Sequence, residues 1–535
     1  MTWWDKFLSH HSIYLNILIL IEGRREDTMA DFIIALVPIF WFVIALGFLK
    51  VSGMYSCIIA YILSAAAGFL WFGLSGSNIV TATVEGIIDG IWPILTVIFA
   101  ALFTFKLTEQ TGELENIKKM LLHITDDKLV LLLVIGFGFG NFLEGVAGFG
   151  TSIIVPAGIL VSIGMDPVRI VSSLLIMTTM TTAFGSVGVT TLVTSQVTGI
   201  SADILSSNVI IIELLPLFLT PYVMIYICGE GLKSIRKMFV ITTISSLAFT
   251  VPAFCIAYFV GPELPDVAGS ISAMVFTILF VKHFYVEEKV DKTKKNTFAL
   301  YQGMRAWSPF IIMFVLLTVT SRLFPFIHDM LVSVKSVFTI YNGINPSVIT
   351  INWLTNSADV IIISAVIGGF IQGMGIKAQI HVLFKAIYKN WSMIVTICSV
   401  MAVAIIMNYS GMIRIIAMFM VVVTGSFYPF VSPLIGGLGS FVTGSATTSS
   451  ALFGNLQTAT ADALGISEAW LAAGNLFGGG VGKIISPQMI SLGASAVQQP
   501  GLDNRILRAT CKWFFILISI GGIFCYFIPV IFKLY

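Results

Sequence analysis

The sequence predicts an all-α polytopic membrane protein with about 12 transmembrane helices, two helical hairpins and an internal inverted repeat with broken helices around a midplane site. Three observations support this fold class. Of 535 residues, 57% are hydrophobic and only 10% are charged, against roughly 25% charged in soluble domains. Apolar runs of membrane-spanning length recur along the chain. The two halves of the chain also share residues at a constant spacing.

The N-terminal extension, residues 1–30, stands apart from this pattern. Its apolar run at 13–21 is too short to span a bilayer and is followed by a charged stretch at 23–27. It fits an uncleaved leader, a surface helix, or sequence upstream of a start at Met29. These alternatives stay open, as does its presence in the mature protein, so the fold prediction begins at residue 31.

Apolar runs long enough to cross the bilayer are found at 32–49, 54–74, 87–107, 167–195, 207–228, 237–260, 264–281, 307–327, 359–376, 391–411, 466–494 and 511–532. Two further apolar stretches, 129–164 and 428–462, are interrupted by Gly, Ser and Thr. We interpret them as hairpins with non-helical tips, because non-helical backbone persists in a membrane only where it faces protein or water. Polar, glycine-containing stretches also predict that the spans 167–195 and 466–494 are broken helices.

An internal repeat relates the two halves at an offset of 299 residues. The identical pairs are Trp92 and Trp391, Gly112 and Gly411, Gly140 and Gly439, Phe142 and Phe441, and Gly145 and Gly444. Further on the register slips by two residues, so that Thr178 aligns with Asn475 and Gly185 with Gly482. Chance matching in an apolar chain is the alternative, and five identities at one offset argue against it. We place the first repeat at 31–285, a basic loop at 286–306 and the second repeat at 307–535.

Five clusters of Lys and Arg set the predicted orientation. They lie at 113–128, 229–237, 282–305, 377–389 and 505–512. The positive-inside rule assigns all five to the cytoplasmic side, and the predicted spans agree if each hairpin enters and leaves on the same face. The loop after Gly112 is then cytoplasmic and the loop after Gly411 is external, so the second repeat is inverted. Inverted repeats around a midplane site are typical of secondary transporters.

Composition and motifs argue against other classes of protein. The six cysteines are scattered and never form a CxxC pair, so they read as small buried hydrophobes. Patterns HExxH, GxxxxGK[ST] and GxSxG do not occur. An enzyme is therefore the weakest hypothesis, and no cofactor, metal or nucleic-acid partner is expected.

The four interrupted segments are the predicted substrate site. Each break starts a new half-helix, whose free amides and positive dipole suit a small anion. Hydroxyl groups beside these amides suit a carboxylate or the hydroxyl of a hydroxy acid. The candidate substrate-binding residues are Gly145, Gly148, Gly150, Thr151, Thr178, Thr179, Ser445, Thr447, Thr448, Ser449, Asn475, Gly482 and Lys483. The alternative is that Gly and Ser/Thr only permit close helix packing.

Two charges stand out in these segments. Glu144 lies at the first hairpin tip and Lys483 follows the second glycine-rich break. An ionisable group at membrane depth is a functional candidate unless it is merely paired. Lys483 is expected to bind a substrate carboxylate and Glu144 to carry a coupling proton; the alternative is a structural ion pair between them. Glu213 and Asp89 also fall in spans but near their edges, and carry less weight.

Several long motifs resemble one family, the bacterial L-lactate permeases, from about residue 31 to the end. They are Phe142-Leu143-Glu144-Gly145-Val146-Ala147-Gly148-Phe149-Gly150-Thr151, Gln196-Val197-Thr198-Gly199-Ile200, Gly261-Pro262-Glu263-Leu264-Pro265-Asp266, Ala306-Trp307-Ser308-Pro309-Phe310, Met407-Asn408-Tyr409-Ser410-Gly411-Met412, Ala451-Leu452-Phe453-Gly454 and Gly482-Lys483-Ile484-Ile485-Ser486-Pro487-Gln488. The resemblance implies a multi-pass protein of the bacterial inner membrane. It also implies uptake of L-lactate and related 2-hydroxymonocarboxylates, such as glycolate, by proton symport.

The chain departs from this family at a few positions. Residues 178–181 read Thr-Thr-Met-Thr where the family has Asn-Thr-Ala-Pro, and Ser152 and Thr190 replace prolines. Ala446 stands where the family carries an acidic residue. Two alternatives therefore stay open: a carrier of another carboxylate or one coupled to sodium, and a channel or a membrane subunit of a larger complex. The preferred carboxylate, affinity, rate and oligomeric state are left open as well.

Overall fold

The structure, a computed structural model, describes residues 25–532 apart from 43, 46–48, 50, 149, 285–299, 344–348, 355, 498 and 500. Within this part of the chain nearly every element is a helix, and the one sheet is a hairpin of β1 (Lys335–Phe338) and β2 (Ile349–Asn352). Among the described residues, ten helical segments are long and apolar enough to cross a membrane. The all-α polytopic fold class is confirmed. The apolar run at 13–21 and most of the loop at 286–306 lie outside the described residues.

The first half of the chain forms helices that match most of the predicted spans. They are α2 (Arg25–Phe42), α3 (Gly53–Leu70), α4 (Gly76–Asp89), α5 (Thr96–Gln110), α6 (Glu113–Leu122), α7 (Lys128–Leu131), α8 (Gly140–Val146), α9 (Thr151–Ser162), α10 (Pro167–Thr179), α11 (Gly185–Thr198), α12 (Ala202–Cys228), α13 (Leu232–Phe259) and α14 (Pro265–Phe284). The π-helical stretches Gly90–Leu95 and Leu132–Phe139 join α4 to α5 and α7 to α8. Helix α4 was not among the predicted elements.

The second half repeats much of this order. It contains α15 (Leu300–Thr320), α16 (Pro325–Val332), α17 (Ser357–Ile371), α18 (Ile376–Lys389), α19 (Trp391–Tyr409), α20 (Met412–Thr424), α21 (Tyr428–Thr443), α22 (Ala446–Leu464), α23 (Glu468–Gly482), α24 (Pro487–Ala496) and α25 (Asp503–Phe532). The amphipathic helix α18, α20 and the β-hairpin were not predicted. The boundaries of the two inverted repeats stay a prediction.

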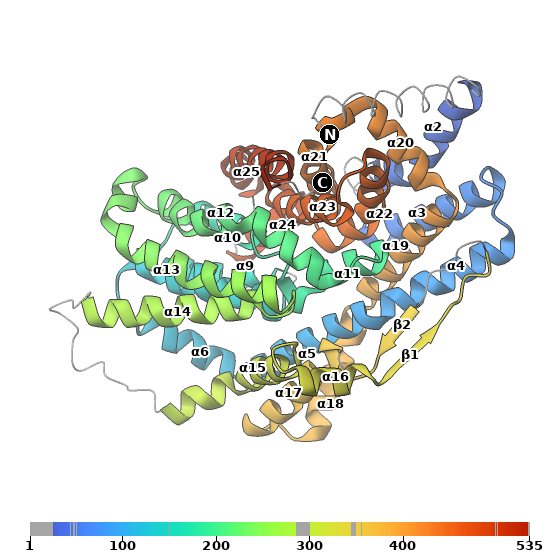
Figure 1. The fold of residues 1–535 in the computed structure, drawn as a ribbon. Coiled ribbons are helices and arrows are strands. Elements are labelled where there is room, and N and C mark those ends of the chain that lie inside the picture. Colours follow the sequence, from blue (N-terminus) through green and yellow to red (C-terminus); the bar gives the residue numbers. More distant parts are fainter. Residues whose placement is uncertain are drawn as a thin grey trace.

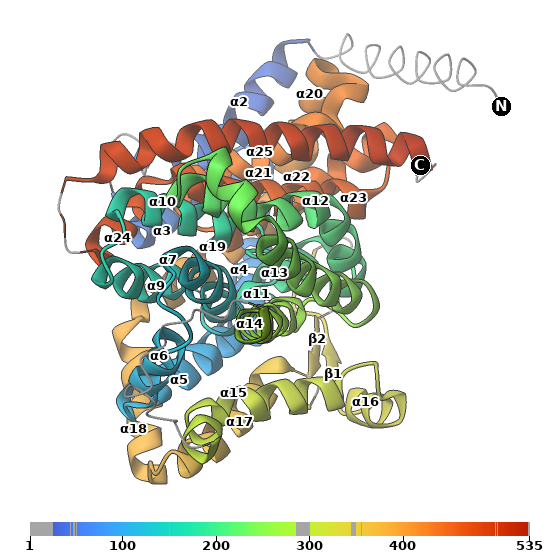
Figure 2. The ribbon, with the colours of Figure 1, turned by 90° about the vertical axis from the view of Figure 1, so that its left-hand side faces the viewer.

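The helices form layers that put the interrupted segments inside the molecule. In Figures 1 and 2, α25 with α21–α23 occupies one edge and α15 with α17 the opposite edge. Helix α19 packs on α3 and α4, and α13 packs on α12 and α14. Nearly all residues of the α7–α8 segment are buried. This helix, which ends in the first hairpin tip, is therefore enclosed by protein rather than by lipid.

Both predicted hairpins are present. Helix α8 ends at Val146, α9 begins at Thr151, and the two helices pack together. Gly150 precedes α9 with φ of 84°, a left-handed conformation that glycine adopts without strain. In the second hairpin, Gly444 with φ of 70° ends α21, and α22 packs back on it. Glycine is thus required at both tips to reverse the chain.

The first broken helix lies where it was predicted, whereas the second break lies further along the chain. Helix α10 ends at Thr179 and regular helix resumes beyond Gly188. The predicted second break, 474–483, is instead regular helix up to Gly482. The chain breaks only at a 3₁₀ turn, Lys483–Ile485, because Ser486 precedes Pro487 and is held in an extended conformation.

The glycines of α23 serve close packing against α21. A Cβ atom at Gly478 would stand 1.8 Å from the carbonyl oxygen of Pro433, and one at Gly482 would stand 2.1 Å from that of Gly437. Only glycine allows two backbones to approach in this way. The packing alternative is therefore correct for this run, and the prediction of a break within it was wrong.

Contacts bring several of the five basic clusters close to one another. Arg305 pairs with Glu113 at 3.0 Å, which links the first and third clusters, and donates to the carbonyl oxygen of Gln372 at 2.9 Å, five residues before the fourth. The first and second clusters line one cavity. Lys512 of the fifth cluster lies 5.9 Å from the ring centre of Tyr226, at the edge of the second. This arrangement agrees with a single cytoplasmic face.

Candidate functional site

A buried ion pair joins the first hairpin to the second broken helix. Lys483 Nζ lies 3.0 Å from Glu144 Oε1, although the residues are 339 positions apart. Glu144 is 3% exposed and Lys483 6% exposed. Each charge is tolerated at this depth because the other balances it. The two charged residues that the sequence singles out are therefore in direct contact.

Two hydroxyl groups complete the hydrogen bonding of this pair. Lys483 Nζ donates to Thr182 Oγ1 at 2.9 Å, and Ser152 Oγ donates to Glu144 Oε2 at 2.5 Å. Thr182 lies in the first break and Ser152 in the first turn of α9. Both lie in segments that the sequence marked as polar and interrupted, but neither was among the candidate residues. The ion pair is thus held by three of the interrupted segments at once.

The break between α10 and α11 carries an unusual backbone conformation next to the ion pair. Ser186, Val187 and Gly188 have φ of 48°, 58° and 77°. A left-handed conformation costs an L-residue about 1–3 kcal/mol and is often found at functional sites. Ser186 Oγ donates to the carbonyl oxygen of Ala147 at 3.1 Å. This bond fastens the strained turn to the first hairpin tip.

Asp266 is an acidic residue that reasoning from the sequence missed as a site residue. It lies in the first turn of α14 and is 1% exposed. A Cβ atom added at Gly145 would stand 2.8 Å from the Cβ atom of Asp266. Asp266 therefore packs directly on the residue after Glu144. Within the described part of the chain neither of its carboxylate oxygens has a hydrogen-bond partner. Its place in the Gly261–Asp266 motif was the available signal.

The charged groups that act on Asp266 are Glu144, Glu213 and Lys483. Glu213 of α12 is 1% exposed, and among the described residues its Oε2 has no hydrogen-bond partner. Asp266, which packs on Gly145, therefore adds a second buried carboxyl group close to the Glu144–Lys483 pair. One lysine balances only one carboxylate, and burial of further unpaired charge is strongly unfavourable.

The other candidates in the first hairpin shape its tip. Gly145 leaves room for Asp266, and Gly148 leaves room for the hydroxyl of Ser186. Gly148 and Gly150 both have positive φ. Thr151 Oγ1 donates to the carbonyl oxygen of Gly148 at 2.8 Å. These residues therefore position Glu144 and its neighbours.

Apart from Lys483, the candidate side chains on the other three segments have no hydrogen bond to the ion pair among the described residues. Most of their side chains bond to nearby backbone or to one another: Thr178 and Thr179 to the carbonyl of Leu175, Ser449 to that of Gly436, Ser445 to the amide of Thr448, Thr447 to Thr190, and Asn475 to Gln457. Gly482 precedes Lys483 at the α21 contact. These bonds stabilise the hairpins and breaks.

The two hairpin tips and the two broken helices meet one another. Thr190 of α11 lies 3.2 Å from Thr447 at the second tip. On α24, Leu492 lies against Gly150, and Gln488 lies against Gly444. Each half-helix after a break therefore contacts the hairpin of the opposite repeat. In the described part of the chain, no group of three or more His, Cys, Asp or Glu is placed to hold a metal ion.

Comparison with known proteins decides the family. The family model described as L-lactate permease matches residues 31–532. The chain belongs to the L-lactate permease family. It is similar to an L-lactate permease of Streptococcus iniae, with 39% identity over 83% of this chain and 94% of that protein. It is also similar to the glycolate permease GlcA of Escherichia coli K12, with 33% identity over 92% and 94%.

Membership of the L-lactate permease family makes the chain a multi-pass membrane transporter and not an enzyme. Among solved structures, it is similar to the YdaH transporter of Alcanivorax borkumensis, with a TM-score of 0.45 and 13% identity over 82% of this chain and 85% of that one.

Proposed function

We propose that the chain imports L-lactate and related small 2-hydroxymonocarboxylates, such as glycolate, by proton symport across the bacterial inner membrane. The names of its relatives support this class of substrate. The single observation that carries the coupling mechanism is the buried contact between Lys483 and Glu144. It is an ion pair that a substrate carboxylate is able to replace.

The first step is a competition for Lys483. A substrate carboxylate and the Glu144 carboxylate are alternative partners of the same ammonium group. If the substrate takes Lys483, Glu144 is left as an unpaired buried anion, which is strongly unfavourable. Binding a proton to Glu144 removes that charge. Proton binding and substrate binding therefore favour each other, and one proton accompanies each carboxylate.

The hydroxyl groups around Lys483 provide selectivity for a 2-hydroxy acid. Thr182 accepts a hydrogen bond from Lys483, donates one to the carbonyl oxygen of Thr178, and lies in the break. It is placed to contact the 2-hydroxyl of a substrate whose carboxylate lies on Lys483. The remaining candidate residues would line the path when the hairpins move.

Asp266 would deliver the proton. It packs against Gly145 beside Glu144, has no hydrogen-bond partner within the described residues, and shares its surroundings with Glu213. A carboxyl group buried without a counter-charge is most stable when protonated. Asp266 is thus a reservoir from which Glu144 takes its proton when the substrate arrives.

The test is uptake of labelled L-lactate into proteoliposomes that contain only this protein, with an imposed pH gradient and no sodium. We expect accumulation that a protonophore abolishes. Uptake that requires sodium, or that is independent of the pH gradient, would contradict proton symport. Accumulation of another carboxylate without L-lactate would contradict the proposed substrate.

A further inference from the structure

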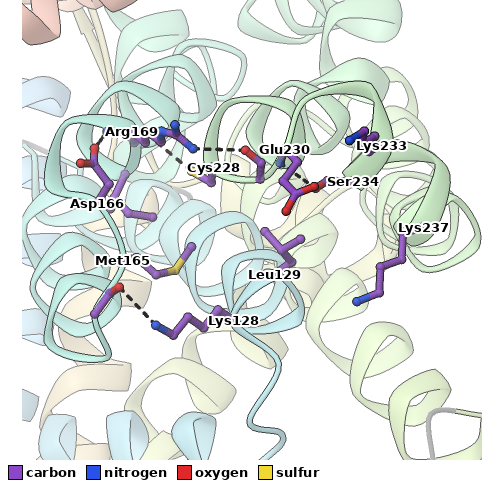
Figure 3. A pocket seen from close by; sticks show the side chains of 13 residues that line it. Lys128, Leu129, Met165, Asp166, Arg169, Cys228, Glu230, Lys233, Ser234 and Lys237 are labelled. Atoms are coloured by element: carbon purple, nitrogen blue, oxygen red, sulfur yellow. Dashed lines mark hydrogen bonds between the residues drawn. The ribbon is translucent and has the colours of Figure 1, made fainter.

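A second polar site lies away from the Glu144–Lys483 pair. It is found where α12 ends and where α7, α10 and α13 begin (Figure 3). It is a cavity of about 520 Å³. Figure 3 shows Lys128, Arg169, Lys233 and Lys237 around it, with the apolar side chains of Leu129 and Met165 between them. No part of the proposed transport mechanism uses this cavity.

The cavity has an excess of positive charge. Four basic residues line it, against the two acidic residues Asp166 and Glu230. Asp166 is engaged, because its carboxylate caps α10 by accepting from the amide of Arg169 at 2.9 Å. In the part of the chain that the structure describes, none of the four basic residues has an acidic partner within 4.0 Å. Their charge is left for a ligand.

Two of these cations are held in place by neutral groups. Lys128 Nζ donates to the carbonyl oxygen of Gly164 at 3.2 Å, and Arg169 Nη1 donates to that of Gly229 at 3.2 Å. Lys233 and Lys237 lie one helical turn apart in α13, so both face the same side. A set of fixed and adjustable cations suits a phosphate group, which accepts several hydrogen bonds at once.

The position of the cavity identifies the source of that phosphate. It opens among the basic clusters that the positive-inside rule assigns to the cytoplasmic side, beside the ends of membrane-spanning helices. Anionic lipid headgroups concentrate there, and basic pockets between helices bind them. Leu129 and Met165 provide apolar surface for the lipid's glycerol and acyl chains. We propose that the cavity binds the phosphate of an anionic phospholipid from the cytoplasmic leaflet.

The experiment counts bound lipids on the purified full chain by native mass spectrometry. The protein is taken from nanodiscs of phosphatidylcholine alone, or of phosphatidylcholine with phosphatidylglycerol or cardiolipin. The variant Lys233→Ala/Lys237→Ala is compared with Lys377→Ala/Lys385→Ala, which removes the same charge from exposed positions of α18. Lys128→Gln is a second pocket variant, milder for folding. Size-exclusion chromatography checks that each variant is folded.

We expect wild type and the α18 control to retain anionic lipid. The double pocket variant should bind it about thirtyfold more weakly, since each cation near an anionic surface contributes about 1 kcal/mol. Equal retention by wild type, control and pocket variants would overturn the proposal. So would displacement of the lipid by millimolar inorganic phosphate, because the site would then serve a soluble anion. Neither result depends on transport activity, so the proposed function is tested separately.

Discussion

The two hairpins occupy matching places in the predicted repeat and differ in chemistry. Each turns at glycine, but the first places Glu144 at its tip, whereas the second has Thr443 at the equivalent position. The broken helices show the opposite difference, since Lys483 aligns with Ser186 of the first half. Each repeat thus supplies one charge, and a hydroxyl replaces it in the other repeat. The predicted pseudosymmetry therefore applies to the positions of the hairpins and breaks, whereas in the described part of the chain the buried ion pair is formed once, between the two halves.

The largest expected effect is that of removing the cation. Lys483→Met leaves Glu144 buried and unpaired, so we expect transport to be lost and the free energy of unfolding to fall by about 3–5 kcal/mol. Denaturation in detergent and uptake assays measure the two effects. The double variant Glu144→Gln/Lys483→Met should regain stability without regaining transport. If the double variant is as unstable as the single one, the two residues do not depend on each other.

Removing the acid should separate binding from coupling. Glu144→Gln keeps the shape of the side chain but cannot exchange a proton, so we expect accumulation driven by a pH gradient to be abolished. Exchange of lactate for lactate should continue, because Lys483 is then free for the substrate. Counterflow in proteoliposomes measures this. The matched control is Thr443→Val in the second hairpin, which should keep coupled uptake; its loss would show that the charge asymmetry is not what matters.

Asp266→Asn should slow coupling and spare binding. The amide mimics a protonated carboxyl group but delivers no proton, so we expect net uptake to be slower by about tenfold or more. The lactate concentration for half-maximal exchange should hardly change. Stopped-flow recording of a pH dye inside the vesicles gives the rate. A variant with unchanged net uptake would remove Asp266 from the mechanism.

The smallest effect is expected at Thr182. Thr182→Val removes an acceptor of a charged hydrogen bond, worth about 1.5 kcal/mol, and should weaken lactate binding about tenfold. Thr448→Val, at the second tip, should change binding less than about twofold, because the hydroxyls that hydrogen-bond the ion pair among the described residues are those of Ser152 and Thr182. Binding isotherms compare the two variants. Equal effects would mean that hydroxyls at both tips contact the substrate.

The sequence predicted the fold class and the two central charges for simple physical reasons. Apolar runs, interrupted stretches and basic clusters are local features, and each reports how its own segment meets lipid or water. Glu144 and Lys483 were recognisable because charge is rare in apolar segments. Reasoning from the sequence left open whether they pair, and the structure places them in contact.

Other features depend on contacts between distant segments. The run from Gly474 to Gly482 looks like a helix break, and only the approach of α21 shows why the glycines are there. Asp266 looks like an ordinary acidic residue in the first turn of a helix. Its motif, Gly261–Asp266, marks it, but its contact with Gly145 beside Glu144 joins distant segments and is seen only in the structure.

The central claim is that a substrate carboxylate and a proton enter together because they share the Glu144–Lys483 pair. Isothermal titration calorimetry of L-lactate binding, in two buffers with different ionisation enthalpies, counts the protons taken up. We predict an uptake of about one proton per lactate in wild type and none in Glu144→Gln. Binding without proton uptake in wild type, or equal uptake in the variant, would contradict this mechanism.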